Sequence, residues 1–281
     1  MKLVRFGQTG SEKPGILDAD GAIRDLSAHI SDLDGSALTP ESLAKLRAVD
    51  VSSLPKAPAD ARLSAPVANV RSFIAVGLNY ADHAAETGSP IPPEPILFNK
   101  LGNCIVGPND DVIMPRGSTK LDWECEIAFV ISKRMSYIEE KDAMSHIAGF
   151  CVCNDVSERV FQSERGGSWM KGKSFETSGP LGPYLVTPDE IKDPQNLGMW
   201  LDVNGKRMQT GNTNTMIFTM AYLAHYISQF MVLEPGDVVT TGTPPGVGLG
   251  MKPQTFLKVG DVMTLGIDGL GEQKLKVVGP R

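Results

Sequence analysis

The chain has 281 residues, 41% of them hydrophobic and 21% charged, which is enough to bury a substantial core. The net charge of −6 and the scattered basic residues exclude the positive surface by which proteins bind nucleic acids or anionic membranes. No apolar segment approaches the ~20 residues that span a bilayer, and the first residues lack a signal core, so we expect a cytoplasmic protein.

Residues 1–65 are expected to form a small N-terminal domain. The segment 13–26 predicts two short strands joined at an Asp-Gly turn, because glycine supplies the positive φ of a tight hairpin. A helix is predicted over 39–49, with Thr39 as its N-cap and a proline at the first helical position. The proline-rich stretch 52–66 then predicts a linker and a domain boundary near its end.

The remainder of the chain, residues 66–281, is predicted to form a large, strand-rich domain. Apolar runs that end in polar residues predict strands within 72–80, 125–132, 148–155, 235–243 and 259–278, the last as a hairpin. Helices are predicted at 155–164 and 215–230. Because strands and helices do not alternate regularly, we expect an α+β fold with a large mixed sheet or barrel-like roll, and not a doubly wound sheet.

The segment 121–132 has an unusual pattern of side chains. Successive residues of a strand point to opposite faces. One face would hold Trp123 and four further apolar side chains, and the other Asp122, Glu124 and Glu126, followed by small apolar residues. Both faces become apolar along the strand, so the strand is expected to be buried, and its two glutamates need an explanation.

The two glutamates lie two residues apart, ~6.6 Å along a strand, so their carboxylates can converge on one point. Buried like charges raise each other's pKa unless a cation, a shared proton or a metal ion lies between them. Asp155, at the end of another apolar strand, can supply a third carboxylate, and such a set suits Mg²⁺ or Mn²⁺. Two simpler interpretations are open: Asp155 and Glu158 match a helix capping box, and the glutamates could begin an exposed strand.

A second polar group occurs in the stretch GLNYADHAAETG, residues 77–88. His83 and Glu86 are three residues apart and share a face on a helical turn. A carboxylate that accepts from one imidazole nitrogen leaves the other as a base toward water. A packed or surface histidine is the simpler interpretation. The proline-rich segment 88–95 follows and suits a lid over a site.

Two further segments could contact a small substrate. Lys171 and Lys173 are expected in a glycine-bearing loop, where a lysine can neutralise an oxyanion or a carboxylate, although most lysines are simply surface residues. The glycine-rich stretch 240–250 lacks the Gly-Lys-Ser/Thr of a phosphate loop. Its threonines, Thr241 and Thr243, could hold a carboxylate instead.

The four cysteines, at positions 104, 125, 151 and 153, do not suggest a disulfide framework in a chain of this length. Cys151 and Cys153 share a strand face and could bind zinc, but zinc ribbons use C-x-x-C turns. We therefore expect buried, reduced thiols.

Over roughly residues 70–275 the chain resembles the fumarylacetoacetate hydrolase family. Five motifs carry the resemblance in the same order: GLNYADHAAE, DWECEIAFVI, NDVSERVFQ, KGKSFETSGPLGP and TTGTPPGVG. The resemblance implies a mixed β-roll with a small N-terminal domain. It also implies a homodimer, with a homotetramer as the alternative.

The resemblance implies roles for nine residues, numbered here as in this chain. The implied ligands of Mg²⁺ or Mn²⁺ are Glu124, Glu126 and Asp155. The implied catalytic residues are His83 and Glu86, which activate water, and Lys173, which precedes Ser-Phe, in preference to Lys171. The implied substrate-binding residues are Arg159, Gln162 and Thr243.

The resemblance further implies hydrolysis of a C–C bond in a 2,4-diketo acid. The likeness is to hydrolases of L-2,4-diketo-3-deoxyrhamnonate or the fuconate analogue, which yield pyruvate and L-lactate. The alternatives are an oxaloacetate decarboxylase, a 2-hydroxy-dienedioate isomerase and, less similar, a ureidoglycolate lyase. A keto-acid sensor would not need the base His83, and a structural metal would need more than three carboxylates to complete six-fold coordination.

Overall fold

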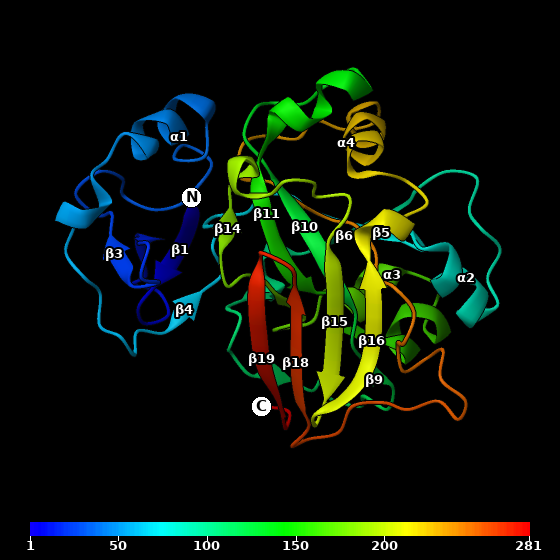
Figure 1. Ribbon diagram of the computed structural model, residues 1–281. Coiled ribbons are helices and arrows are strands. Elements are labelled where there is room, and N and C mark those ends of the chain that lie inside the picture. Colours follow the sequence, from blue (N-terminus) through cyan, green and yellow to red (C-terminus); the bar gives the residue numbers. More distant parts are fainter.

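The computed structural model describes residues 1–281 as two β-sheets with short helices around them (Figure 1). The long sheet consists, in spatial order, of β3 (Ile23–Asp25), β2 (Lys13–Leu17), β1 (Lys2–Phe6), β14 (Leu185–Val186), β11 (Ile147–Asn154), β10 (Cys125–Ile131), β17 (Val238–Thr240), β5 (Phe73–Gly77) and β6 (Ile96–Lys100), with β4 (Leu63–Ser64) paired to β1. The second sheet consists of β16 (Lys206–Asn212), β15 (Gly198–Val203), β18 (Val262–Ile267), β19 (Gly271–Val278) and β8 (Val112–Ile113).

Two short strand pairs complete the β-structure. They are β7 (Ile105–Val106) with β13 (Gly179–Pro180), and β9 (Leu121–Asp122) with β12 (Ser157–Glu158). The pairing is mixed, because β5 runs parallel to β17 and β8 parallel to β19, whereas most neighbours are antiparallel. The expected α+β fold with a mixed sheet is therefore confirmed, and so is the hairpin of β18 and β19.

The helices are α1 (Pro40–Arg47), α2 (Ala81–Thr87), α3 (Trp169–Lys173) and α4 (Met220–Ser228). Helix α1 confirms the prediction for 39–49, since the hydroxyl of Thr39 accepts a hydrogen bond from the Ser42 amide. Helix α4 begins later than predicted, because Thr219 caps it while the preceding amides bond to Asn79. No helix has both the length and the apolar character that a membrane crossing requires.

The helix predicted over 155–164 is wrong. The chain continues as β12 and then forms a single π-turn at Val160–Glu164. A capping box would turn the Glu158 carboxylate back to the Asp155 amide, but its Oε2 accepts from the Ser118 hydroxyl and the Lys120 amide and its Oε1 from the Val160 amide. Local spacing suggested a helix, but the pairing of β12 with β9 overrides it.

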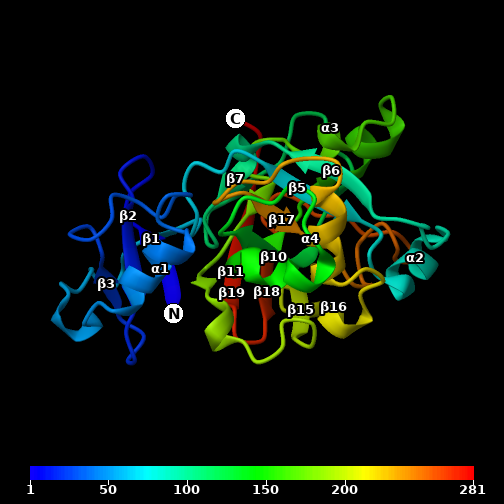
Figure 2. The ribbon, with the colours of Figure 1, turned by 90° about the horizontal axis from the view of Figure 1, so that it is seen from above.

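The N-terminal strands and α1 lie at one side of the molecule, blue in Figures 1 and 2. The predicted hairpin of β2 and β3 is present, and Gly21 in its turn has φ +79°. Hydrogen bonds from β1 to β14 join this part to the long sheet, and β4, within the expected linker, pairs with β1. One hydrophobic cluster extends across residue 65, so the domain boundary stays a prediction.

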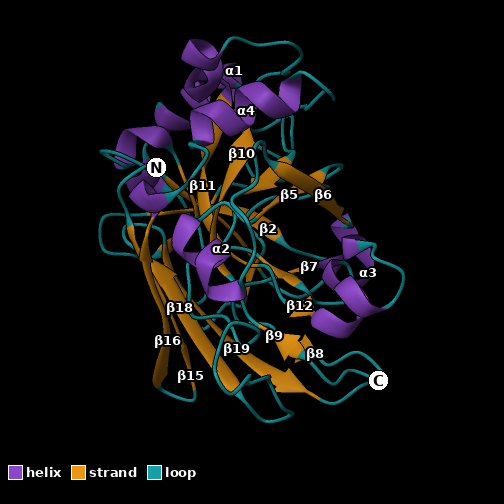
Figure 3. Cartoon of the chain, turned by 90° about the vertical axis from the view of Figure 1, so that its right-hand side faces the viewer, coloured by secondary structure: helices purple, strands orange, loops and turns teal.

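Strand β10 positions Glu126, and Glu124 immediately precedes this strand. Its two faces contact different hydrophobic clusters: Ile127 and Phe129 pack in one, Ala128 and Val130 in the other. The alternation predicted for 121–132 is thereby confirmed. The glutamates share the face of Ala128, at the start of the strand. Helices α2 and α3 lie away from the N-terminal strands, on the side from which Figure 3 is seen.

Candidate active site

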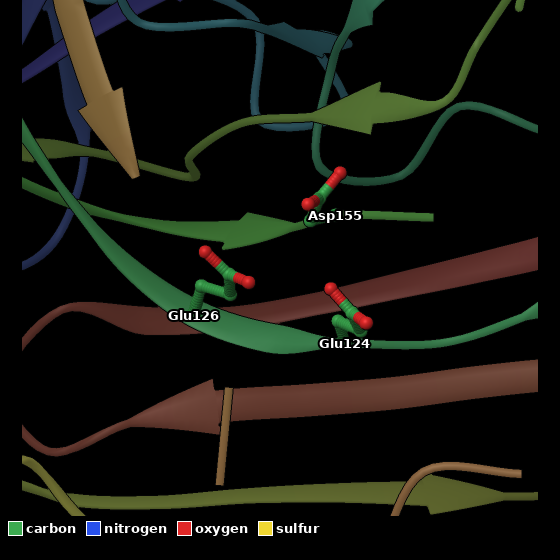
Figure 4. A group of neighbouring side chains, drawn as sticks. All are labelled: Glu124, Glu126 and Asp155. Carbon is green, nitrogen blue, oxygen red and sulfur yellow. The ribbon is translucent and has the colours of Figure 1, made fainter. Parts of the chain in front are cut away.

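Three carboxylates converge where β10 begins and β11 ends. The two strands are antiparallel, with Glu126 opposite Cys153, so Asp155 after β11 lies beside Glu124 (Figure 4). The three side chains are 6%, 1% and 1% exposed for Glu124, Glu126 and Asp155, and their nearest oxygens all lie within 4.8 Å of one another. An exposed strand start and a helix cap are therefore both wrong as interpretations of these residues.

Three cations surround part of this cluster. The Lys173 ammonium lies 2.6 Å from Glu124 Oε2 and 2.8 Å from Asp155 Oδ2. The Arg159 Nη1 lies 2.7 Å from Glu124 Oε1. The buried Asp155 Oδ1 lies 2.8 Å from Lys100 Nζ, but no donor meets it in hydrogen-bond geometry. Burial opposes ionisation of Glu124, yet Lys173 and Arg159 lower the pKa of its carboxyl to about 2.

Glu126 is the carboxylate with no cation in ion-pair contact. Its Oε2 accepts hydrogen bonds from the Thr240 hydroxyl at 2.5 Å and the Gly242 amide at 2.9 Å. Burial, followed by the charges of Asp155 and Glu124, raises the pKa of Glu126 well above its ordinary value. Three buried carboxylates, one of them without a cation in contact, fit a hard divalent cation.

Asp122 fixes Arg159 and the glycine-rich stretch together. Its Oδ2 accepts from Arg159 Nε at 2.8 Å, and its two oxygens accept from the Gly248 and Leu249 amides at 2.7 and 2.9 Å. Sequence reasoning placed Asp122 on the polar face of its strand but gave it no partner. The sequence did indicate that Asp122 needs a partner, because it lies with Glu124 and Glu126 on one face of a buried strand.

The sequence analysis did not identify Lys100 as a residue of the site. It is fully buried at the end of β6, and it donates to the carbonyl oxygens of Lys173 and Ser178, the latter at 3.0 Å. Burial lowers the pKa of a lysine, but the charge of Asp155 outweighs this and raises the pKa of Lys100. A lysine that ends the apolar run ILFNK was the available signal.

His83 and Glu86 lie on one face of α2, as their spacing indicates. The His83 Nδ1 is 3.3 Å from Glu86 Oε2, and both oxygens of Glu86 accept from the Gly246 amide, at 3.0 and 3.1 Å. His83 is 6% exposed. A side chain oriented in this way can direct Nε2 toward a small substrate or a water.

Substituting Gly250 by alanine should lower activity with little loss of stability. A Cβ at Gly250 would lie 2.4 Å from Cδ and 2.7 Å from Oε2 of Glu86, so the carboxylate must shift from its present position beside His83. The moving atoms are the end of a flexible side chain, so we expect a stability change within about 0.5 kcal/mol. Steady-state kinetics and urea unfolding test this, and unchanged kcat would contradict the proposed orienting role of Glu86.

The region of Lys171 and Lys173 differs from expectation, because it is the short helix α3 and not a loop. A Cβ at Gly172 would lie 2.5 Å from the Gln162 amide nitrogen and from the Glu158 carbonyl oxygen, so glycine permits this close packing. Lys173 is buried among the carboxylates, whereas Lys171 is exposed and donates to the Arg165 carbonyl oxygen at 2.7 Å.

These residues surround a cavity of about 250 Å³. The sequence-predicted residues that line it are His83, Glu124, Glu126, Arg159, Gln162, Lys173 and Thr243. Glu86 and Asp155 contact lining residues from behind. The Thr243 hydroxyl is already used, since it donates to the Cys125 carbonyl at 2.9 Å and accepts from Gln209 at 2.8 Å. Thr241 likewise donates to the Ile127 carbonyl at 2.8 Å and does not line the cavity, so the expectation that it holds a carboxylate there is wrong, whereas the substrate-binding role of Thr243 stays a prediction.

All four cysteines are buried and unpaired, which confirms the expectation of reduced thiols. Burial raises the pKa of Cys151 to about 12 and that of Cys153 well above its ordinary value. Neither belongs to a group of three metal-ligating side chains, so the structure provides no zinc site there.

Known proteins agree with this architecture. Residues 72–278 match the family described as fumarylacetoacetate (FAA) hydrolase C-terminal. A Burkholderia lata protein named "putative hydrolase" is 56% identical over 274 residues, which cover 97% of each chain.

Two solved structures are similar to this chain over its whole length, and over the whole of their own length. One is maleylpyruvate hydrolase from Sphingobium sp. SYK-6 in complex with manganese(II) and pyruvate, 26% identical with a TM-score of 0.83. The other is 5-carboxymethyl-2-hydroxymuconate delta-isomerase from Mycobacterium smegmatis, 30% identical with a TM-score of 0.79. The chain therefore belongs to the fumarylacetoacetate hydrolase family.

Proposed function

We propose that the protein is a divalent-metal-dependent hydrolase that cleaves the C3–C4 bond of a 2,4-diketo acid. The proposed substrate is L-2,4-diketo-3-deoxyrhamnonate or the fuconate analogue, and the products are pyruvate and L-lactate. One observation carries the proposal: a single small cavity is lined by the buried glutamates of the acidic cluster and by His83, which Glu86 holds from behind. The similarity to a maleylpyruvate hydrolase crystallised with manganese(II) and pyruvate supports it.

Each residue of the site has a role in the proposed hydrolysis. Glu124, Glu126 and Asp155 would hold Mg²⁺ or Mn²⁺, which supplies Lewis acidity toward the oxygens of the pyruvate part. His83 Nε2 takes a proton from water while Glu86 stabilises the imidazolium at Nδ1. The hydroxide adds to C4, and the ammonium of Lys173 stabilises the oxyanion. The C3–C4 bond then breaks with its electron pair moving to C3, and the imidazolium returns its proton there, which gives pyruvate and a carboxylic acid.

A coupled assay for pyruvate and lactate on synthetic L-2,4-diketo-3-deoxyrhamnonate tests the proposal. Equal amounts of the two products are expected, with EDTA abolishing both. Oxaloacetate in a parallel reaction tests for a decarboxylase. Pyruvate from oxaloacetate, without lactate from the diketo acid, would refute the proposed substrate. Tight binding of the diketo acid by calorimetry without any product would instead indicate a sensor.

His83→Asn should lower kcat by about 10²–10⁴-fold, the usual contribution of a general base. Because His83 is not among the three carboxylate ligands, the affinity for Mn²⁺ should remain within about threefold, as measured by calorimetry. Loss of Mn²⁺ binding together with activity would show that His83 supports the metal site and not the water.

The similarity to the M. smegmatis delta-isomerase favours one second candidate, the isomerisation of a 2-hydroxy-dienedioate. Such a reaction needs no activated water, so an isomerase would retain its activity in His83→Asn better than a hydrolase. Ultraviolet absorbance of the dienol substrate reports this directly. The homodimer or homotetramer stays a prediction, which light scattering would test.

A further inference from the structure

We propose that the cavity admits an uncharged substrate tail, so that the ligands of this site are monocarboxylic 2-oxo acids and not dicarboxylic ones. The inference rests on the proposed function and narrows its substrate class.

The first argument is that the lysine and arginine side chains lining the cavity already form ion pairs with carboxylates of the protein. Arg159 and Lys173 are the two that do so. Arg159 is in contact with Asp122 and Glu124, at 2.8 and 2.7 Å. Lys173 contacts Glu124 and Asp155. Both therefore lie at the proposed metal end, where the C1 carboxylate and the C4 oxyanion of the proposed reaction would also lie, and neither is available to a second carboxylate at the far end of the substrate.

The second argument is the chemistry of the remaining lining. Apart from His83, Glu124, Glu126, Arg159 and Lys173, the cavity is lined by uncharged residues, among them Leu78, Thr87, Phe98, Ser163, Trp169 and Leu249. Trp169 packs over Gly77, where a Cβ would lie 2.4 Å from the indole ring, and meets Phe98 edge-on with ring centroids 5.3 Å apart.

This combination of apolar walls and hydroxyl groups suits methyl and hydroxyl substituents. A carboxylate placed against it without a partner cation would lose its hydration uncompensated, which costs far more than burying a neutral group. The small volume also favours a short tail, since about 250 Å³ lies below the range of ~300–1,000 Å³ usual for larger ligands.

Two other cations lie close in sequence to the lining residues. Arg165 and Lys171 line a separate, more open depression with Phe161, and Lys171 donates to the Arg165 carbonyl oxygen. They are exposed, so they provide a control: if a second carboxylate were recognised from outside the cavity, these two residues would be the ones to do it.

Calorimetry on the Mn²⁺-loaded protein with 2-oxohexanoate and 2-oxoadipate tests the inference. The two acids have six carbons each and differ only in a terminal methyl group against a carboxylate. We expect 2-oxohexanoate to bind at least about 10-fold more tightly, because the second carboxylate finds no cation. Equal affinities, tighter binding of 2-oxoadipate, or no binding of 2-oxohexanoate would overturn the inference. Since binding and not turnover is measured, the result does not depend on C–C hydrolysis, and the two proposals can fail separately.

Two variants sharpen the measurement. Ser163→Arg adds a guanidinium to the lining and should raise the affinity for 2-oxoadipate by about 10-fold or more, since charge-assisted hydrogen bonds to carboxylates are strong. Arg165→Ala combined with Lys171→Ala should leave the ratio of the two affinities unchanged. A selective loss of 2-oxoadipate binding in that double variant would show that these cations recognise a second carboxylate, contrary to the inference.

Discussion

Glu126→Gln should abolish divalent-metal binding and turnover while stabilising the metal-free protein. The substitution removes a buried ionisable carboxyl that has only the Thr240 hydroxyl and the Gly242 amide as partners, and the glutamine oxygen can still accept from both. Removing a ligand should weaken Mn²⁺ binding by more than the ~100-fold that loss of a supporting residue costs.

The sign of the stability change follows from the raised pKa of Glu126. A carboxyl whose pKa is higher in the folded protein than the ordinary 4.5 favours the folded state at low pH. That contribution is lost as the pH rises above 4.5 toward the folded pKa, so the advantage of glutamine should grow over the same interval. Each unit of pKa elevation corresponds to about 1.4 kcal/mol.

Glu124→Gln is the matched control, because it should also lose the metal but destabilise the metal-free protein. The lowered pKa of Glu124, about 2, means that its ion pairs with Lys173 and Arg159 stabilise the fold above pH 4.5 and lose this effect as the pH falls toward 2. Urea unfolding in EDTA and calorimetry with MnCl₂ provide both readouts. If the two variants changed stability in the same direction, the charge assignment within the cluster would be wrong.

Lys100→Met should destabilise the protein by about 3–5 kcal/mol, the range for removing one partner of a buried ion pair. Asp155 would then have Lys173 as its remaining ion-pair partner, and the carbonyl oxygens of Lys173 and Ser178 would lose a buried donor. We therefore also expect α3 to shift, with weaker Mn²⁺ binding, although Lys100 does not line the cavity.

Lys171→Met provides the comparison for Lys100→Met. Lys171 is exposed and donates one hydrogen bond to a backbone carbonyl, so its replacement should change the free energy of unfolding by no more than about 0.5 kcal/mol. Urea denaturation of both variants at neutral pH gives the measurement. Similar, small losses for the two lysines would mean that the buried contacts of Lys100 contribute little.

Much of the candidate site followed from short-range pattern. The two glutamates share a strand face because they are two residues apart, and His83 shares a helix face with Glu86 because they are three apart. The same reasoning failed for the helix over 155–164, where the capping spacing of Asp155 and Glu158 was correct as a pattern. In the structure Asp155 forms ion pairs with Lys100 and Lys173, and Glu158 accepts from the Lys120 amide. These contacts with distant residues outweigh the local preference for a helix.

The amino-acid sequence by itself determined the α+β class, the alternation of side chains along the buried strand within 121–132 and the residue types suited to a divalent cation. Alternation and turn chemistry depend on neighbours along the chain, so they can be recognised without a structure. Only the tertiary structure decided which cation meets which carboxylate. Lys173 is 49 residues from Glu124 and Arg159 is 37 from Asp122, and such pairs form only when the packed sheets bring distant strand ends together. For that reason Lys100 and the anchoring contacts of Asp122 became visible only in the fold.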